Sequence, residues 1–248
     1  MTRLLTLLLL LIASPLWAAV SYDSVANSGL LSGVNTASYT HTVGGGCSNA
    51  AVAIGIYGYG GDRTVTSVTV GTGGGLVNAV EMGGQYANGD GGGYNQWTAL
   101  WVASGVGTAG QAINVTLNSS QTKLYVSTVS YCGVNALTPT GTAVISYDLN
   151  TTPTIAGISS ATGEIAVGAV IQRENTGSST CAVSSINNRD NATETYYSTY
   201  LLGDTAGAAS VNLTWTCSDS DAWSGVGVSL KASTGIAPHR QRRLVVFQ

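Results

Sequence analysis

The chain has 248 residues, of which 44% are apolar and only 8% are charged, against about 25% charged residues in ordinary globular proteins. Its abundance of β-branched and aromatic residues argues against intrinsic disorder. From Val20 to Ser233, five lysines and arginines stand against 12 acidic residues, a net charge of −7. Such an acidic body argues against nucleic-acid binding, which needs clustered basic residues.

Residues 1–18 have the layout of a secretory signal peptide. A short basic start is followed by the apolar core Leu4–Ala13, and small residues follow at Ala18 and Ala19. The core is shorter than the roughly 20 apolar residues that a membrane span needs. We predict cleavage after Ala18 and a secreted chain without membrane contact, with a retained membrane anchor as the alternative.

Strand signals separated by turns recur along the rest of the chain. We predict strands at Ser38–Val43, Ala50–Tyr57, Thr64–Val70, Trp97–Ala103, Ala112–Leu117, Lys123–Tyr131, Ala143–Tyr147, Thr154–Ile158, Glu164–Gln172, Cys181–Ile186, Glu194–Leu202, Ser210–Thr216 and Trp223–Leu230. Alternation is clean at Val226, Val228 and Leu230, and no segment has sustained helical periodicity. Many short strands with glycine-rich turns predict an all-β, antiparallel, jelly-roll-like β-sandwich.

One passage of the sequence occurs twice. Trp97–Asn118 and Tyr196–Thr216 both contain an aromatic-rich strand, a turn with Thr-Ala-Gly, and an alternating strand. We therefore predict two similar halves, with pseudo-repeats at about 38–136 and 152–232, inside one domain at 19–233. Because no Pro/Ser-rich linker separates them, we expect each half to give strands to both sheets. Two separate sandwiches, or chance similarity, are the alternatives.

The cysteines are Cys47, Cys132, Cys181 and Cys217. An even number in an exported chain predicts two disulfides, and three connectivities are open. We favour Cys47–Cys132 and Cys181–Cys217, because each bridge would then link an early strand of a half to a late one. Free buried thiols are the alternative. The spacing does not fit a zinc site, since it lacks Cys-x-x-Cys and a nearby histidine.

Few residues are candidates for catalysis. His41 lies in an alternating strand, where a structural role is expected, and the Gly-x-Ser-x-Gly motif of serine hydrolases is absent from the sequence. Glycoside cleavage needs only two carboxylates, and Glu81 with Glu194 is the pair that we favour if the protein is an enzyme. We expect no catalytic residues.

Tyrosine and tryptophan are the more suggestive side chains, because each joins an apolar ring to a polar tip, which suits sugar stacking. Several of them flank Gly71–Gly93, a glycine-rich segment that the second half lacks. If the protein has a specific site, this asymmetry between the halves is where we expect it. The candidate ligand residues are Tyr57, Tyr59, Tyr86, Tyr94, Trp97 and Trp101, and filling of a sandwich core is the alternative role.

Two oxygen-rich loops are candidate calcium sites, since hard cations bind several oxygen ligands on a tight loop. One contains Asp219 and Asp221, and the other contains Asn88 and Asp90. Neither completes the Asp-x-Asp-x-Asp-Gly pattern, so Ca²⁺ is one expectation and solvated turns are the other.

The tail at 234–248 combines a basic run, which includes Arg240, with a short apolar stretch. It is expected to be disordered, to act as a sorting signal, or to pair with an exposed sheet edge of another copy. The candidate assembly residues are Leu244, Val245, Val246 and Phe247.

Three motifs carry a resemblance to a known kind of module. They are Ser38-Tyr-Thr-His-Thr-Val-Gly-Gly-Gly, then Asn49-Ala-Ala-Val-Ala-Ile-Gly-Ile, and then Val65-Thr-Ser-Val-Thr-Val-Gly. Together they resemble a β-sandwich module of secreted bacterial proteins and phage fibre or appendage proteins. The chain departs from that pattern at Ala50, where arginine is usual, and at the inserted Cys47. The resemblance, which extends over about Ser38–Leu230, implies a sandwich at a cell or virion surface and transfers no functional residues.

These observations favour a secreted structural or adhesive surface protein that self-associates through exchange of terminal strands. A carbohydrate-binding module that uses the loop tyrosines is the first alternative. A glycan-active enzyme and a phage virion component are the others.

Overall fold

The computed structural model describes residues 19–72, 75–87, 95–173, 180–183, 186–194 and 198–233. The predicted signal peptide, Tyr94, the loop with Asn88 and Asp90, and the tail with Leu244–Phe247 lie outside these residues. Within the described ranges, no helix is long and apolar enough to cross a membrane.

The described chain is all-β and antiparallel, as predicted. Its strands are β1 (Ser21–Asn27), β2 (Leu31–Val43), β3 (Ala50–Tyr59), β4 (Val65–Val70), β5 (Val77–Asn78), β6 (Val80–Tyr86), β7 (Gln96–Val106), β8 (Ala109–Cys132), β9 (Val144–Asn150), β10 (Thr154–Ile158), β11 (Ile165–Arg173), β12 (Cys181–Val183), β13 (Asn187–Glu194), β14 (Ser198–Ala206), β15 (Val211–Cys217) and β16 (Asp221–Leu230).

The first half is a nearly closed, barrel-like sandwich, and its longest strand, β8, belongs to both of its sheets. The first part of β8 pairs with β2 and β4, and its second part pairs with β1 and β3. An inner sheet, β6-β7-β3-β8-β1, therefore continues through β8 into an outer sheet, β5-β4-β8-β2. The sequence predicted two separate strands here, Ala112–Leu117 and Lys123–Tyr131. In the structure, β8 continues without a break through the polar residues between them.

The second half repeats this pairing. Its inner sheet is β13-β14-β11-β16-β9 and its outer sheet is β10-β15-β12, so β16 and β15 together take the place of β8. The predicted two similar halves are confirmed. The expectation that the halves share sheets is wrong, because among the described residues no strand of one half pairs with a strand of the other. Val134–Ala232 and Thr140–Leu230 are isolated bridges outside the named strand pairs.

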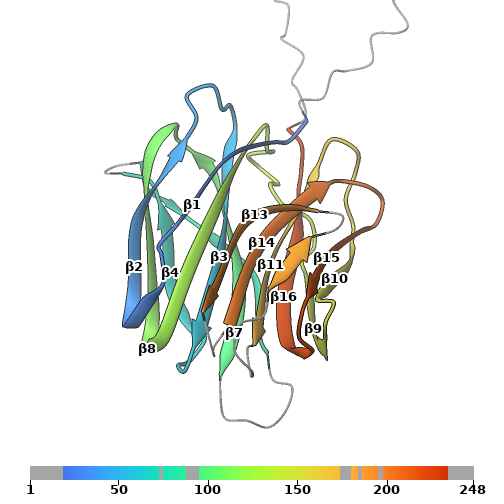
Figure 1. Ribbon diagram of the computed structural model, residues 1–248. Coiled ribbons are helices and arrows are strands. Elements are labelled where there is room, and N and C mark those ends of the chain that lie inside the picture. The colour runs from blue at the N-terminus through green and yellow to red at the C-terminus, as the bar shows by residue number, and fades with distance from the viewer. Residues whose placement is uncertain are drawn as a thin grey trace, which may run out of the picture.

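The physical reason lies in the central strands, which are buried along their whole length on both faces. This holds for β3, β11 and β16, and such strands need a cover on each side. Stacking one sandwich on the other supplies the second cover. Four layers result, which Figure 1 shows from β2 and β4 on the left, through the two inner sheets, to β10 and β15 on the right.

Alternate residues of β3 therefore face different cores. Ala53 and Tyr57 point into the central core, which the two inner sheets share. Ile54 and Ile56 point into the core between the inner and outer sheets of the first half. A third core, around Trp215, fills the corresponding space in the second half.

Polar contacts across the central core fix how the two halves sit against each other. The Tyr57 hydroxyl donates a 2.7 Å hydrogen bond to the carbonyl oxygen of Leu201. Lys123 and Glu194 form an ion pair between the halves. Tyr125, Tyr131 and Asn27 of the first half also bond to carboxylates of the second. The stack is therefore held in one register by directional bonds as well as by apolar burial.

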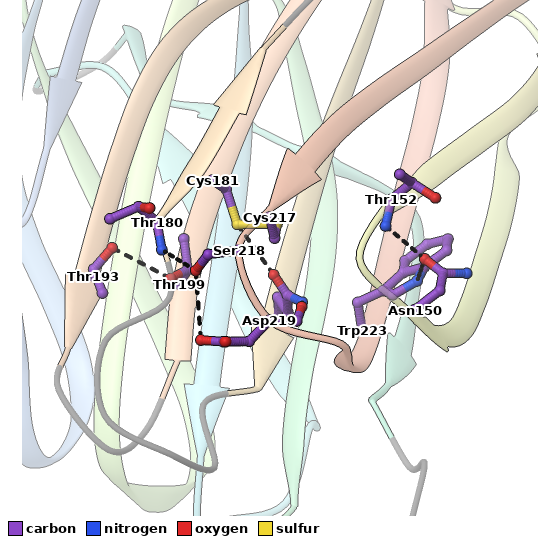
Figure 2. The surroundings of a disulfide bond; sticks show 11 residues. Asn150, Thr152, Thr180, Cys181, Thr193, Thr199, Cys217, Ser218, Asp219 and Trp223 are labelled. Carbon is purple, nitrogen blue, oxygen red and sulfur yellow. Dashed lines mark hydrogen bonds between the residues drawn. A yellow bond between two sulfur atoms is a disulfide. The ribbon is translucent and has the colours of Figure 1, made fainter.

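Each half contains one disulfide, in the favoured connectivity. Cys47–Cys132 joins the turn before β3 to the end of β8, and Cys181–Cys217 joins β12 to β15 at directly paired positions. Figure 2 shows the second bridge beside Ser218, whose hydroxyl accepts a bond from the Thr180 amide. Two disulfides are typical of proteins in an oxidising, extracellular environment.

Candidate ligand-binding site

Three of the aromatic residues predicted to bind ligand lie inside the protein. Tyr57 and Trp97 have no exposed surface, and Tyr59 is 7% exposed. The Trp97 indole donates a 3.0 Å bond to Gln121. Little or none of the surface of these three residues is open to a ligand, so their burial does not support a ligand-binding role. Trp101 is half-buried against the outer core of the first half.

Tyr86, by contrast, lines an open pocket of about 310 Å³. The pocket lies where the turn between β3 and β4 meets the edge strand β6. Its lining residues are Asp62, Arg63, Thr64, Val65, Glu81 and Tyr86. Glu81 and Tyr86 belong to the glycine-rich segment in which a specific site was expected.

The polar groups of the pocket are linked to one another. Arg63 Nη1 lies 3.2 Å from Glu81 Oε1, and its guanidinium carbon lies 5.9 Å from the centre of the Tyr86 ring. The Tyr86 hydroxyl accepts a 3.0 Å bond from the Arg63 amide and donates a 3.2 Å bond to Asp62. Thr64 donates a 2.8 Å bond to the same carboxylate. The bond from Thr64 and then that from Tyr86 lower the pKa of Asp62, so this carboxylate is charged at neutral pH.

The core beneath the pocket holds these groups in place. Gln121 donates a 2.9 Å bond to the carbonyl oxygen of Asp62, and Trp97 in turn bonds to Gln121. On the other side, Gly84 leaves room for Arg63, because a Cβ there would lie 2.2 Å from Arg63 Nη1. The site is thus preorganised by a buried tryptophan and by the missing side chain of one glycine.

The structure does not bring the predicted carboxylate pair together. Glu81 lies on β6, whose sheet edge contacts β9, and it pairs with Arg63. Glu194 lies on β13, whose sheet edge contacts β1, and it pairs with Lys123. Glycoside cleavage needs two carboxylates on either side of one bond, and these two stand at opposite edges of the stacked sheets.

The candidate cation loop is described only around Asp219 and Asp221. The Asp219 carboxylate lies 3.4 Å from Ser218 Oγ, whereas Asp221 is buried. Among the described residues, one group has metal-ligand spacing, namely Asp23 with Cys47 and Cys132. Both of those sulfurs are bonded to each other, so they are not thiolate ligands.

Sequence reasoning missed a buried polar network around His41. Its Nε2 lies 3.1 Å from Ser24 Oγ, and its Nδ1 lies 2.9 Å from Thr128 Oγ1. Ser130 lies 2.8 Å from Ser24 and donates a bond to Asp23. This is not the arrangement of a Ser-His-Asp triad, because the second imidazole nitrogen bonds to a threonine instead of the carboxylate. The partners are far apart in sequence, so no local motif signals them.

No protein-family model, curated protein or solved structure matches this chain. Its function is therefore inferred from the geometry of the site.

Proposed function

We propose that this chain is an extracellular adhesive protein that binds carbohydrate in the pocket of Arg63 and Tyr86. The observation that carries the proposal is the convergence of a guanidinium, two carboxylates, a hydroxyl and an aromatic ring in one preformed, open pocket. Planar charged groups bond well to neighbouring sugar hydroxyls, and an aromatic ring contacts the apolar face of a sugar. A pocket of this volume takes one or two sugar rings.

The extracellular location is supported by the two disulfides and by the predicted export signal. The low-charge body, rich in glycine, serine and threonine, also suits a surface protein. A rigid four-layer scaffold is a good platform for adhesion, since a preorganised site loses little entropy on binding.

A glycan array probed with the mature protein tests the proposal, followed by titration calorimetry with the strongest ligand. Arg63→Gln, Glu81→Gln and Tyr86→Phe should each weaken binding about tenfold or more, because each removes a directional contact. Lys231→Gln and Tyr147→Phe are matched controls on the second half and should bind like the wild type. An array without ligands, or pocket variants that bind as well as the controls, would exclude a carbohydrate site here.

A further inference from the structure

The two inner sheets end in four edge strands, and three of them are interrupted. A register shift occurs in β1 between Tyr22 and Ser24, in β6 between Glu81 and Gly83, and in β13 between Asn188 and Asp190. Bulges of this kind are a common way to stop an edge strand from pairing with another molecule.

The same three edges are also covered or charged. The Arg189 guanidinium of β13 lies 3.9 Å from the centre of the Tyr22 ring on β1. β6 carries the Glu81 ion pair, and its Gln85 carbonyl oxygen accepts a 3.0 Å bond from Ser224. Charge and side-chain cover are further protections of an edge.

β9 is the exception among the four. It pairs with β16 without a register shift over its whole length, from Val144 to Asn150. Its alternate residues Ile145, Tyr147 and Leu149 are 47%, 64% and 48% exposed. A regular edge strand with an apolar stripe is a template for a further strand.

We propose that β9 pairs in antiparallel fashion with β9 of a second copy of the chain, about a two-fold axis at Tyr147. A seven-residue strand centred on Tyr147 places Ile145 opposite Leu149 of the second copy and Tyr147 opposite its own counterpart. Ser146 then faces Asp148 of the second copy, so the two aspartates are never opposite each other. The strand therefore matches apolar residues with apolar residues and avoids charge repulsion, as a two-fold interface requires.

The pairing should be weak. Asp148 Oδ1 accepts a 2.8 Å bond from the Leu149 amide, and this carboxylate must move when the amide bonds to a neighbouring strand. One strand pair also buries less surface than the roughly 1,200 Å² of stable complexes. We expect a dissociation constant on the order of 0.1 mM, which matters for a protein crowded on a surface.

Sedimentation equilibrium of the mature chain up to millimolar concentration tests the pairing. The wild type should dimerise, Tyr147→Lys should be monomeric, and Asp148→Ala should dimerise about twofold to fivefold more tightly. Val25→Lys is the matched control, because Val25 is 39% exposed on the bulged edge β1, and it should dimerise like the wild type. Equal thermal unfolding of Tyr147→Lys and the control shows that folding is unaffected.

Cross-linking tests the register. At the two-fold axis the paired Cα atoms lie about 4.5–5.5 Å apart, within the range of a disulfide. Tyr147→Cys should therefore form a covalent dimer on mild oxidation, whereas Val25→Cys should not. A wild type that is monomeric throughout contradicts the pairing. Loss of the dimer on deletion of Leu244–Gln248 also overturns it, and would assign the association to the tail.

Discussion

His41 Nε2 lies 3.1 Å from Ser24 Oγ, and this contact links β2 of the outer sheet to β1 of the inner sheet. The imidazole has no exposed surface, and its other nitrogen bonds to Thr128. Burial lowers the pKa of His41 to about 4, with the charge of Asp23 acting in the opposite direction. The histidine of the folded protein is therefore neutral at pH values well above 4.

The stability of the protein should fall as the pH is lowered from about 6.5 to 4. In this window the unfolded chain binds a proton on His41 and the folded chain does not, so protonation favours unfolding. The slope from this one group is about 1.4 kcal/mol per pH unit, and its total effect is about 3 kcal/mol at most. Urea unfolding at several pH values measures it.

His41→Gln is the matched variant for this effect. It should be less stable than the wild type at pH 7, because a buried bond is lost, but its stability should change less between pH 6.5 and 4. Carboxylates remote from His41 contribute equally to both proteins and cancel in the difference. Parallel pH profiles for the two proteins would contradict a neutral, buried His41.

Asp204 should be the most sensitive polar residue between the two halves. It is 1% exposed and accepts bonds from the Tyr131 hydroxyl at 2.7 Å and from Arg189 Nε at 2.7 Å. Asp204→Ala leaves a partly buried guanidinium and a buried hydroxyl unpaired, which should cost about 3–5 kcal/mol. Tyr131→Phe should cost only about 1 kcal/mol.

Chemical denaturation measures both changes. Asp219→Ala is the control, because among the described residues its carboxylate has one long contact, with Ser218. The control should stay within about 0.5 kcal/mol of the wild type. If Asp204→Ala lost no more than Tyr131→Phe, the Arg189–Asp204 ion pair within the second half would add no stability beyond the bond from Tyr131.

The strands that the sequence predicted well are those whose own residues carry the signal. β11, β15 and β16 lie within a few residues of their predicted ranges. β1, β6 and β13 were missed, because edge strands such as β13, with the sequence NNRDNATE, have little apolar alternation. They form strands because an adjacent strand provides backbone hydrogen-bonding partners.

The four-layer stack was missed for a related reason, since an apolar run in the sequence does not show which sheet covers each of its faces.

The candidate site was predicted in part. Glu81 and Tyr86 were singled out by their place in the glycine-rich segment, and both line the pocket. Tyr57 and Tyr59 are two residues apart on β3, as alternation on one face predicts, but both are buried, and Tyr57 packs in the core shared with the second half. Arg63 was missed because its contact with Glu81 depends on the register of β6, a strand that has no clear pattern of its own.

Removal of either disulfide should destabilise the protein substantially. The bridges close loops with sequence separations of 85 residues for Cys47–Cys132 and 36 residues for Cys181–Cys217. The chain-entropy model gives a loss of about 4 to 5 kcal/mol for each, slightly larger for the longer loop. Thermal unfolding of the two paired Cys→Ala variants measures this, and unchanged melting temperatures in both would contradict a stapling role.

Gly84→Ala should change the pocket more than the fold. The new Cβ would lie 2.2 Å from Arg63 Nη1 and 2.9 Å from the carbonyl oxygen of Thr98. The flexible guanidinium moves more easily than the backbone, so Arg63 should leave Glu81 and the carbohydrate affinity should fall about tenfold. The stability cost should be about 1–3 kcal/mol. Gly45→Ala, which meets no atom within 4 Å, is the matched control.

A double-mutant cycle separates the contact of that Cβ with Arg63 from its contacts with Thr98 and Ala99. Arg63→Ala removes the guanidinium, so adding Gly84→Ala to it should cost less stability and no further affinity, which is the non-additivity of residues in contact. The stability cost that remains then comes from the contacts with Thr98 and Ala99. Strict additivity in both measurements would mean that Gly84 does not position Arg63.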